Sequence, residues 1–145
     1  MHLVEQLEAD LAAAMRERDH VRLQVVRLLK SALKNQQIEL GHELTPQQML
    51  AVLQKEAKKR RDSIDAYKSA GRDDLVREEA AELEQIEHYL PAQLTEDEVR
   101  AIVREVVAAN PGAQMGQIIG QVIARVDGRS DGGMVSKLVR AELQA

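Results

Sequence analysis

Glycines and aspartates cluster near the carboxyl end of the chain in a pattern that could contact phosphate. In the segment VDGRSDGGMVSKLV, residues 126–139, Gly128 and Gly133 have the spacing of the two glycines of a phosphate-binding P-loop. That loop also needs Lys and Ser or Thr directly after the second glycine, and a β-strand before the first. Met134 and Val135 occupy these two positions, so the segment does not predict a nucleotide-binding loop.

The same residues fit a corner between two helices. Gly128 is expected to adopt the left-handed conformation that ends one helix, and Asp131 to cap the next, whose first turn contains Gly132 and Gly133. Uncapped amides at a helix start attract anions, and Arg129 lies beside them. We therefore expect a helix corner that also contacts phosphate.

Basic side chains flank this corner on both sides. Lys137 and Arg140 are expected on the exposed face of the last helix, and Arg125 lies just before the corner. An ordinary solvated face is the alternative, and it is the commoner one. The opposite, apolar side is predicted to contain Met134, Val135, Leu138, Val139 and Ala141. The candidate RNA-binding residues of this region are Arg125, Arg129, Lys137 and Arg140.

Two glycines in the preceding helix could allow another backbone to come close. Gly116 and Gly120 are four residues apart, and glycine lowers helix stability while removing the side chain that would hold a neighbour away. The neighbour could be another helix of the protein or the backbone of an RNA.

A second basic segment, KEAKKRRD, spans residues 55–62. It suggests direct RNA contacts at Lys58, Lys59 and Arg61, although a basic run alone is only an electrostatic indication. The alternative is charge pairing with the next, antiparallel helix. That helix contains Glu78, Glu79, Glu82, Glu84 and Glu87.

Residues for covalent or metal chemistry are sparse. The chain has no cysteine, and no two serines are adjacent. Ser136 and Lys137 are neighbours, but adjacent residues on a helix point about 100° apart and cannot relay a proton directly. Glu84 and His88 have an i, i+4 spacing, yet a metal site needs three or four ligands. We predict no catalytic residues, no metal and no cofactor.

The composition predicts an all-α protein. The 145 residues include no Phe or Trp, and Tyr67 and Tyr89 are the only aromatic residues. Leu, Val, Ile, Ala and Met must form the core, and these residues with Glu, Lys, Arg and Gln favour helices. The start of the chain lacks a basic, apolar signal segment, and no stretch is long and apolar enough to span a bilayer. These features predict a soluble cytoplasmic protein.

Charge is distributed unevenly along the chain. The net charge is −4, so the average surface does not attract nucleic acid. Residues 16–34, however, contain six basic residues and two acidic ones, whereas residues 73–87 contain seven acidic residues and only Arg77 as a base. Local surfaces could therefore still bind a polyanion.

Helix start and stop signals predict seven helices in two domains. Thr45 with Gln48, and Thr95 with Glu98, form capping boxes, and Pro91 is expected to end the fourth helix. Four helices are expected in an N-terminal domain of residues 1–91. The first has its apolar repeat from Leu3 to Met15, the second runs from after Asp19 until Gly41, the third from Pro46 to Gly71, and the fourth from near Asp73 until Pro91. Three more, at about 96–109, 114–125 and 132–143, form a compact domain of residues 92–145. The fourth helix is expected to bury Val76, Ala80, Leu83, Ile86 and Leu90.

Several motifs resemble those of the YqeY-like family. They are AGRDDL, HYLPAQLTEDEV and MGQIIGQVIARVDGRSDGGMVSKLV, and the likeness covers essentially the whole chain. The family's C-terminal unit is similar to the tail domain of the B subunit of the glutamine-dependent aminoacyl-tRNA amidotransferase. The resemblance implies a helical N-terminal domain joined to a three-helix, tail-like domain.

The resemblance also implies a role with tRNA. The amidotransferase tail domain contacts tRNA, and in some bacteria a similar module is joined to glutaminyl-tRNA synthetase. We therefore expect a noncatalytic tRNA-binding module, with a glutaminyl-tRNA synthetase or an amidotransferase as a possible partner enzyme. Two alternatives remain: part of a carbon–nitrogen ligase with glutamine as amide donor, or a protein–protein adaptor. The sequence leaves the RNA, the partner enzyme and the oligomeric state open.

Overall fold

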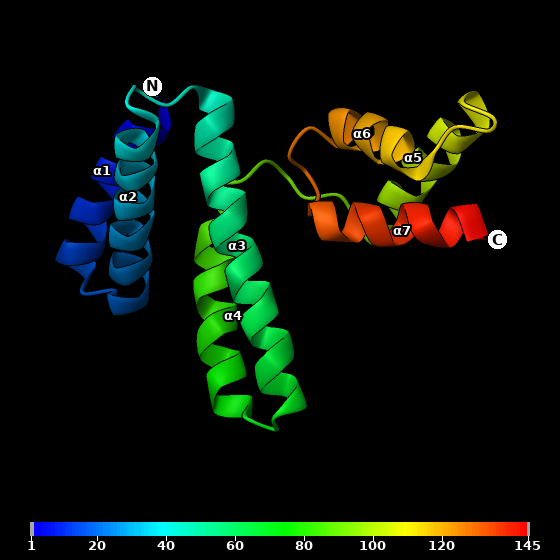
Figure 1. Ribbon diagram of the computed structural model, residues 1–145. Helices are drawn as coiled ribbons and strands as arrows, with labels where there is room; N and C mark the ends of the chain where they lie inside the picture. Colours follow the sequence, from blue (N-terminus) through cyan, green and yellow to red (C-terminus); the bar gives the residue numbers. More distant parts are fainter. Residues whose placement is uncertain (1, 145) are drawn as a thin grey trace. The chain divides into compact units, whose positions relative to one another are not determined.

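The described part of the chain is entirely helical. The computed structural model of the protein describes residues 2–144, with the side chains of residues 3–144. The described elements are seven α-helices, and they group into two compact units, Met1–Leu90 and Pro91–Ala145 (Figure 1). The helices are α1 (His2–Glu17), α2 (His20–Leu40), α3 (Pro46–Ser69), α4 (Asp73–Glu87), α5 (Glu96–Ala109), α6 (Met115–Val126) and α7 (Gly132–Gln144). The predicted all-α fold class is confirmed.

The N-terminal unit consists of two helical hairpins joined through α2. Helix α1 packs on α2, α3 packs on α4, and α2 contacts both α3 and α4. The α3–α4 hairpin extends past the end of the α1–α2 pair (Figure 1). Aliphatic side chains from all four helices form the core, together with one residue between α2 and α3 and one after α4. The core contains Leu7, Val25, Val26, Leu29, Leu33, Leu44, Met49, Leu53, Ala57, Ile86 and Leu90.

Local capping signals determine where the helices of this unit begin and end. The Asp19 carboxylate accepts a hydrogen bond of 3.2 Å from the amide of Arg22, and Gly41 ends α2 with a φ of 78°. The Thr45 hydroxyl accepts from the Gln48 amide at 3.1 Å, while the Gln48 side chain accepts from the Thr45 amide at 2.9 Å. The capping box predicted at the start of α3 is confirmed.

The predicted extent of the fourth helix is wrong at its end. Helix α4 stops at Glu87, and the next residues form tighter i→i−3 bonds, from the Tyr89 amide to Ile86 O at 3.0 Å and from the Leu90 amide to Glu87 O at 3.1 Å. The residue before a proline is disfavoured in the helical region, which explains the early end before Pro91.

Two residues that were predicted to be buried are exposed. Ala80 lies about 120° around α4 from the fully buried Ile86 and therefore faces solvent. Ala141 on α7 is also exposed, about 160° around that helix from Val139. In both helices the side that packs on the core is narrower than the apolar pattern indicated.

Both tyrosines belong to the N-terminal unit. The Tyr89 hydroxyl donates a hydrogen bond to the Asp10 carboxylate, which also accepts from the Arg22 guanidinium at 3.0 Å. Burial, followed by the bond to Asp10, raises the pKa of the Tyr89 phenol above its ordinary value of 10. These contacts join α1 and α2 to the end of α4.

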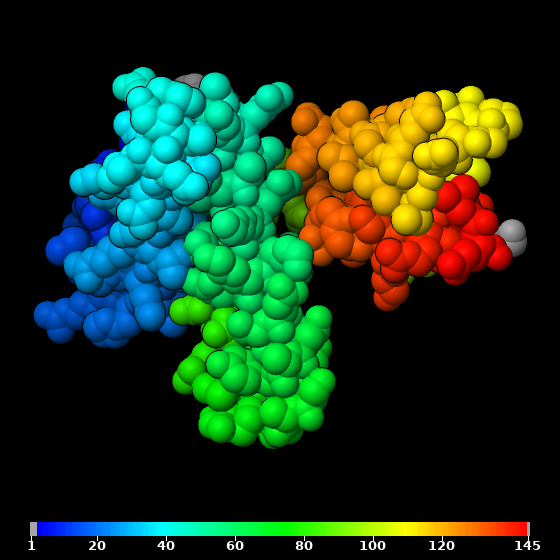
Figure 2. Space-filling model, viewed as in Figure 1, coloured from blue at the N-terminus to red at the C-terminus, as the bar shows by residue number. Residues whose placement is uncertain are grey.

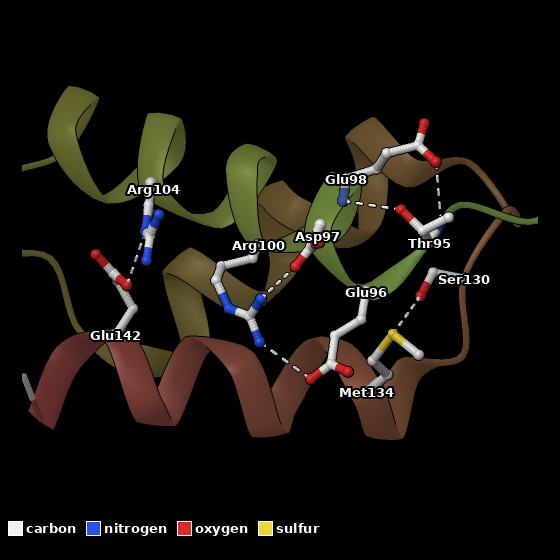
Figure 3. Close-up of polar contacts among 9 residues, drawn as sticks. All are labelled: Thr95, Glu96, Asp97, Glu98, Arg100, Arg104, Ser130, Met134 and Glu142. Atoms are coloured by element: carbon white, nitrogen blue, oxygen red, sulfur yellow. Dashed lines mark hydrogen bonds and ion pairs between the residues drawn. The ribbon is translucent and has the colours of Figure 1, made fainter.

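The C-terminal unit is a three-helix assembly in which each helix packs on the other two. Its core consists of Val99, Val103, Val106, Ile118, Val122, Val126, Val135, Leu138 and Val139. The capping box predicted at Thr95 and Glu98 is confirmed, with bonds of 3.1 and 3.2 Å (Figure 3). Arg104 of α5 forms an ion pair of 3.4 Å with Glu142 of α7 (Figure 3).

Candidate nucleic-acid interface

The predicted helix corner between α6 and α7 exists. Asp127 is the residue that ends α6, with a left-handed φ of 46°, and Gly128 follows with a φ of 78°. The prediction that Gly128 itself ends the helix is therefore off by one residue. Two successive residues with positive φ reverse the chain, and glycine adopts this conformation without the steric cost that other residues incur.

The Arg129 side chain points back to the helix it follows. Its Nε donates to Val126 O at 3.0 Å and its Nη2 to Arg125 O at 3.3 Å. The guanidinium thus binds carbonyls at the end of α6, where the helix dipole also favours a positive charge. It also lies near Glu98, whose pKa is lowered first by hydrogen bonds to Thr95 and in smaller part by this positive charge. Arg129 has a structural role in the corner.

The first turn of α7 is capped by a carboxylate. Asp131 Oδ1 accepts from the Gly133 amide at 3.1 Å, and Asp131 O accepts from the Val135 amide at 3.1 Å. The cap predicted at Asp131 is confirmed. The expectation of uncapped amides is wrong at Gly133, because the carboxylate already occupies that donor and its negative charge opposes an incoming anion.

The outward face of α7 retains two positive charges. Lys137 and Arg140 are both exposed, and within residues 3–144 neither side chain has a hydrogen bond or an ion pair. With Gly133 and Gln144 they form a stripe at positions i, i+4, i+7 and i+11, which we call the α7 stripe. The stripe contains no acidic residue. Its cations are therefore available to an anionic partner.

Arg125 is neutralised within the unit. Its Nη2 forms an ion pair of 2.7 Å with Glu105 of α5, and both side chains are about half exposed or more, at 48% and 62%. Exposed pairs of this kind contribute about 0–1 kcal/mol, so a phosphate could replace the carboxylate at small cost. Arg125 is a weaker candidate than Lys137 or Arg140.

Gly116 and Gly120 lie on an open surface of α6. A Cβ built on either glycine would meet nothing within 4 Å among the described residues. Neither α5 nor α7 of the same unit therefore crosses α6 closely at these positions, and the approach of a partner's backbone stays a prediction. Besides Arg125 near its end, the other exposed residues of α6 are uncharged: Met115, Gln117, Ile123 and Ala124.

The basic segment 55–62 is largely paired with acidic residues. Lys58 pairs with Asp62 at 3.0 Å, and Lys59 with Glu56 at 3.3 Å. Arg61 pairs with Glu87 of α4 at 3.5 Å. The charge pairing that we considered as the alternative to RNA contact is present here.

Arg60 is the centre of a small charged cluster between α3 and α4. It lies 3.4 Å from Glu56, 3.8 Å from Glu79 and 3.1 Å from Glu82, and its side chain is only 12% exposed. Burial, and then the charge of Glu82, raises the pKa of Glu79. Three carboxylates share one guanidinium, so this cluster carries excess negative charge and does not attract phosphate.

Helix α2 carries two unpaired cations that were not among the predicted site residues. Arg27 and Lys34 lie on α2, are exposed, and have no partner within residues 3–144. The sequence signal that could have identified them is the absence of any acidic residue between His20 and Ile38.

A serine nucleophile and a bound metal ion are two groups that catalysis could use, and the described residues show the surroundings of both. The Ser130 hydroxyl is buried and donates to the sulfur of Met134 at 3.7 Å (Figure 3). Within residues 3–144 no group of three or more His, Asp or Glu side chains is placed to hold a metal ion.

No helix in the described range is long and apolar enough to cross a membrane.

Comparison with known proteins gives one family and one group of relatives. The family model described as Yqey-like protein matches residues 4–143. Proteins named altered inheritance of mitochondria protein 41, mitochondrial, are similar over part of the chain. The one from Eremothecium gossypii is 33% identical over 87 residues, and the one from Lachancea thermotolerans is 35% identical over 88 residues.

The similarity to these relatives covers about half of their length. The matched segment is 59% of this chain and 48% of the Eremothecium protein, and 60% of this chain and 47% of the Lachancea protein. The Saccharomyces cerevisiae relative is 33% identical over 85 residues, which is 58% of this chain and 46% of that protein. The names of these relatives refer to mitochondria and to their altered inheritance.

Proposed function

The chain belongs to the Yqey-like protein family, and from that premise we propose that it is a noncatalytic tRNA-binding module associated with tRNA-dependent amidation or glutaminyl-tRNA synthesis. The observation that carries this proposal is the α7 stripe. Lys137 and Arg140 are exposed there without a carboxylate partner in the described chain, whereas Lys58, Lys59, Arg61 and Arg125 are all paired.

The chemistry of the α7 stripe fits phosphate contacts better than base recognition. Two cations and a glutamine can donate to phosphate oxygens, and such contacts position a protein without reading sequence. The C-terminal unit contains no aromatic residue, so it has no platform on which unpaired bases could stack. The proposal is therefore recognition of the shape and backbone of a folded RNA.

The proposal assigns no catalytic step to the chain. Amide transfer from glutamine needs an activated nucleophile, and activation of an acceptor carboxylate needs a nucleotide and a metal. The buried Ser130 donates to a thioether, and no described hydrogen bond joins Ser136 to Lys137. A ligase role would require a separate catalytic subunit.

Salt-dependent tRNA binding tests the proposal. Each phosphate contact releases counterions, so Lys137→Ala with Arg140→Ala should reduce the slope of log K against log salt concentration by about one to two. Lys58→Ala with Lys59→Ala is the comparison pair, since both side chains are already paired. If the α7 variant binds like the wild type while the comparison variant loses binding, the site lies on α3.

A second function is favoured by the open face of α6. Met115 is 37% exposed and Ile123 45%, and they flank the uncovered glycines at positions 116 and 120. Apolar side chains beside an uncovered backbone suit a protein partner, such as a synthetase or an amidotransferase. Partner capture that survives nuclease treatment and is lost in Ile123→Lys would favour this adaptor role.

We propose the cytoplasm as the place of action, as the sequence suggests. The relatives named above carry the word mitochondrial in their names, which applies to those proteins. Fractionation of cells that express the tagged chain distinguishes the two locations.

A further inference from the structure

Helix α2 carries two sets of cations, and only one set is paired with carboxylates of the described chain. Arg22 and Lys30 are eight residues apart and pair with α1, whereas Arg27 and Lys34 are seven residues apart on an exposed, outward side of the helix. Lys34 also borders a groove of about 340 Å³ between α1 and α2, beside Val4 and Leu7 of α1. Helix α2 has no acidic residue before Glu39, so every negative charge near its first five turns must come from another element.

The set that faces α1 is neutralised. Arg22 pairs with Asp10 at 3.0 Å and with Glu17 at 3.3 Å, and Lys30 pairs with Glu8 at 2.6 Å. Acidic residues of α1 are thus placed opposite these two cations.

The outward set has no such partners. Arg27 and Lys34 are exposed and, among the described side chains, form no ion pair or hydrogen bond. They alternate with His20, Gln24 and Ser31 along one exposed line of α2, and none of these residues is acidic. Figure 2 shows the surface of α2, in light blue and cyan, uncovered on the face toward the viewer.

Further hydrogen-bond donors border this line on the side of α3. A groove of about 220 Å³ between α2 and α3 is lined by Asn35, Lys55 and Lys59, among others. Lys55 is exposed and has no partner among residues 3–144, while Glu56 in the same groove is already paired with Lys59 and Arg60. The acidic residue of the groove that remains unpaired is Glu39, one turn from Asn35.

We propose that Arg27, Ser31, Lys34, Asn35 and Lys55, which we call the α2 surface, form a second binding surface for the phosphate backbone of RNA. It belongs to the N-terminal unit and is distinct from the α7 stripe of the C-terminal unit. The proposal rests on the proposed function for the identity of the polyanion. It adds that each unit of the protein contacts the RNA.

The spacing of the cations favours a polyanion. Seven residues of helix separate Arg27 from Lys34 by about 10 Å, because an α-helix rises 1.5 Å per residue. Successive phosphates of one nucleic-acid strand can each contact one of two cations at this spacing. The exposed large apolar side chain on this line is Ile38 at its end, where Ile38 and Lys34 border the groove between α1 and α2. From His20 to Lys34 the line consists of polar and basic side chains, and this part offers no apolar anchor of the kind that protein interfaces use.

Binding of unfractionated tRNA by the full chain tests the α2 surface. Arg27→Gln with Lys34→Gln keeps good helix formers at exposed sites, so the fold should be unchanged by circular dichroism. The variant should bind tRNA more weakly, and its slope of log K against log salt should be shallower by about one to two. Combined with Lys137→Ala and Arg140→Ala, the loss of slope should be about the sum of the two.

The matched control changes the same charge elsewhere in the same unit. Lys68→Gln with Arg72→Gln removes two exposed cations at the turn between α3 and α4, where Arg72 is paired with Asp74. This variant should bind tRNA nearly like the wild type. An equal loss in control and α2 variants would mean that net charge alone is responsible, and the α2 surface would be rejected.

Lysine acetylation read by mass spectrometry gives an independent measure. Bound tRNA should protect Lys34 several-fold against acetylation and should leave Lys68 unprotected. Protection of Lys34 by vesicles with phosphatidylserine, or by polyglutamate, but not by tRNA would overturn the proposal in favour of a membrane or an acidic protein.

The outcomes separate this proposal from the proposed function. If the α2 variant binds normally while the α7 variant is weakened, the α2 surface is wrong and the α7 stripe stands. The opposite pattern rejects the α7 stripe and keeps the α2 surface. Absence of any tRNA binding by the wild type at low salt rejects both.

Discussion

The hydroxyl of Tyr89 donates a hydrogen bond to the carboxylate of Asp10, across 79 positions of sequence. The same carboxylate accepts from Arg22, which also pairs with Glu17. One side chain of α1 thereby holds both α2 and the segment that follows α4. Leu90, the next residue, belongs to the core of the N-terminal unit and is its last residue.

Removal of the Tyr89 hydroxyl should destabilise the protein. Tyr89→Phe leaves the ring in place but takes one donor from the partly buried Asp10 carboxylate. We expect a loss of about 1–2 kcal/mol in the free energy of unfolding, as for a hydrogen bond to a charged group. Urea denaturation followed by circular dichroism measures the loss. Tyr67→Phe is the control, because the Tyr67 hydroxyl has no partner in the described chain; equal losses would contradict the assignment.

Alkaline pH should weaken the wild type more than the Tyr89→Phe variant. The pKa of Tyr89 is raised in the folded state, so the folded protein holds this proton more tightly than the unfolded chain. Its contribution is fully present below the ordinary tyrosine pKa of about 10 and is lost as pH rises beyond it. Unfolding measured from pH 8 to 11 should show the difference between the two proteins shrinking above pH 10. A constant difference would argue against the raised pKa.

Neutralising Glu79 should stabilise the protein at pH 7. In the folded state burial and Glu82 raise the pKa of Glu79, so its ionised form is disfavoured there relative to the unfolded chain. Glu79→Gln removes that penalty and should add about 0.5–1 kcal/mol to the free energy of unfolding. The gain should diminish as pH falls toward the ordinary glutamate pKa, where the wild-type carboxyl becomes protonated. Thermal melts at pH 7 and pH 5 measure both effects.

Glu78→Gln provides the matched change in charge for this comparison. Glu78 is exposed, one residue from Glu79, and has no partner in the described chain. Its replacement should change stability by less than half as much. If both variants gain equally, the effect reflects the general negative charge of α4 and has no connection with the Arg60 cluster.

The C-terminal unit should fold without the N-terminal one. A fragment of residues 91–145 contains the whole second core, and it includes the bond of 2.7 Å from the Leu94 amide to Arg129 O. Such a small unit is near the size at which a single core suffices, so we expect a helical but modestly stable fragment. Circular dichroism with a cooperative thermal transition is the measurement. A random-coil spectrum would show that the predicted domains 1–91 and 92–145 are not separable.

Helix ends were the most predictable part of the structure. Thr45, Thr95 and Asp131 accept hydrogen bonds from amides two or three residues away, so sequence spacing contains nearly all the information needed. The end of α4 was missed because the effect of Pro91 extends to the residue before it, and the chain tightened into a turn a residue or more earlier.

The directions of long charged side chains were the least predictable part. The phosphate contact of Arg129 stays a prediction, but the sequence did not show that its guanidinium donates to carbonyls of α6, which depends on the left-handed conformation of Asp127. The glycines at 116 and 120 suggested a close crossing, but the three-helix packing places them outside. Such outcomes depend on how the helices are rotated against each other, which the pattern of one helix does not specify.

The positions of the two tyrosines give the protein a built-in optical label. The C-terminal unit has neither Tyr nor Trp, so all near-ultraviolet absorbance and intrinsic fluorescence originate in the N-terminal unit. Far-ultraviolet circular dichroism, in contrast, reports the helices of both units. Tyrosine emission and ellipticity followed in a single melt therefore distinguish unfolding of one half of the molecule from unfolding of the other, without any introduced dye.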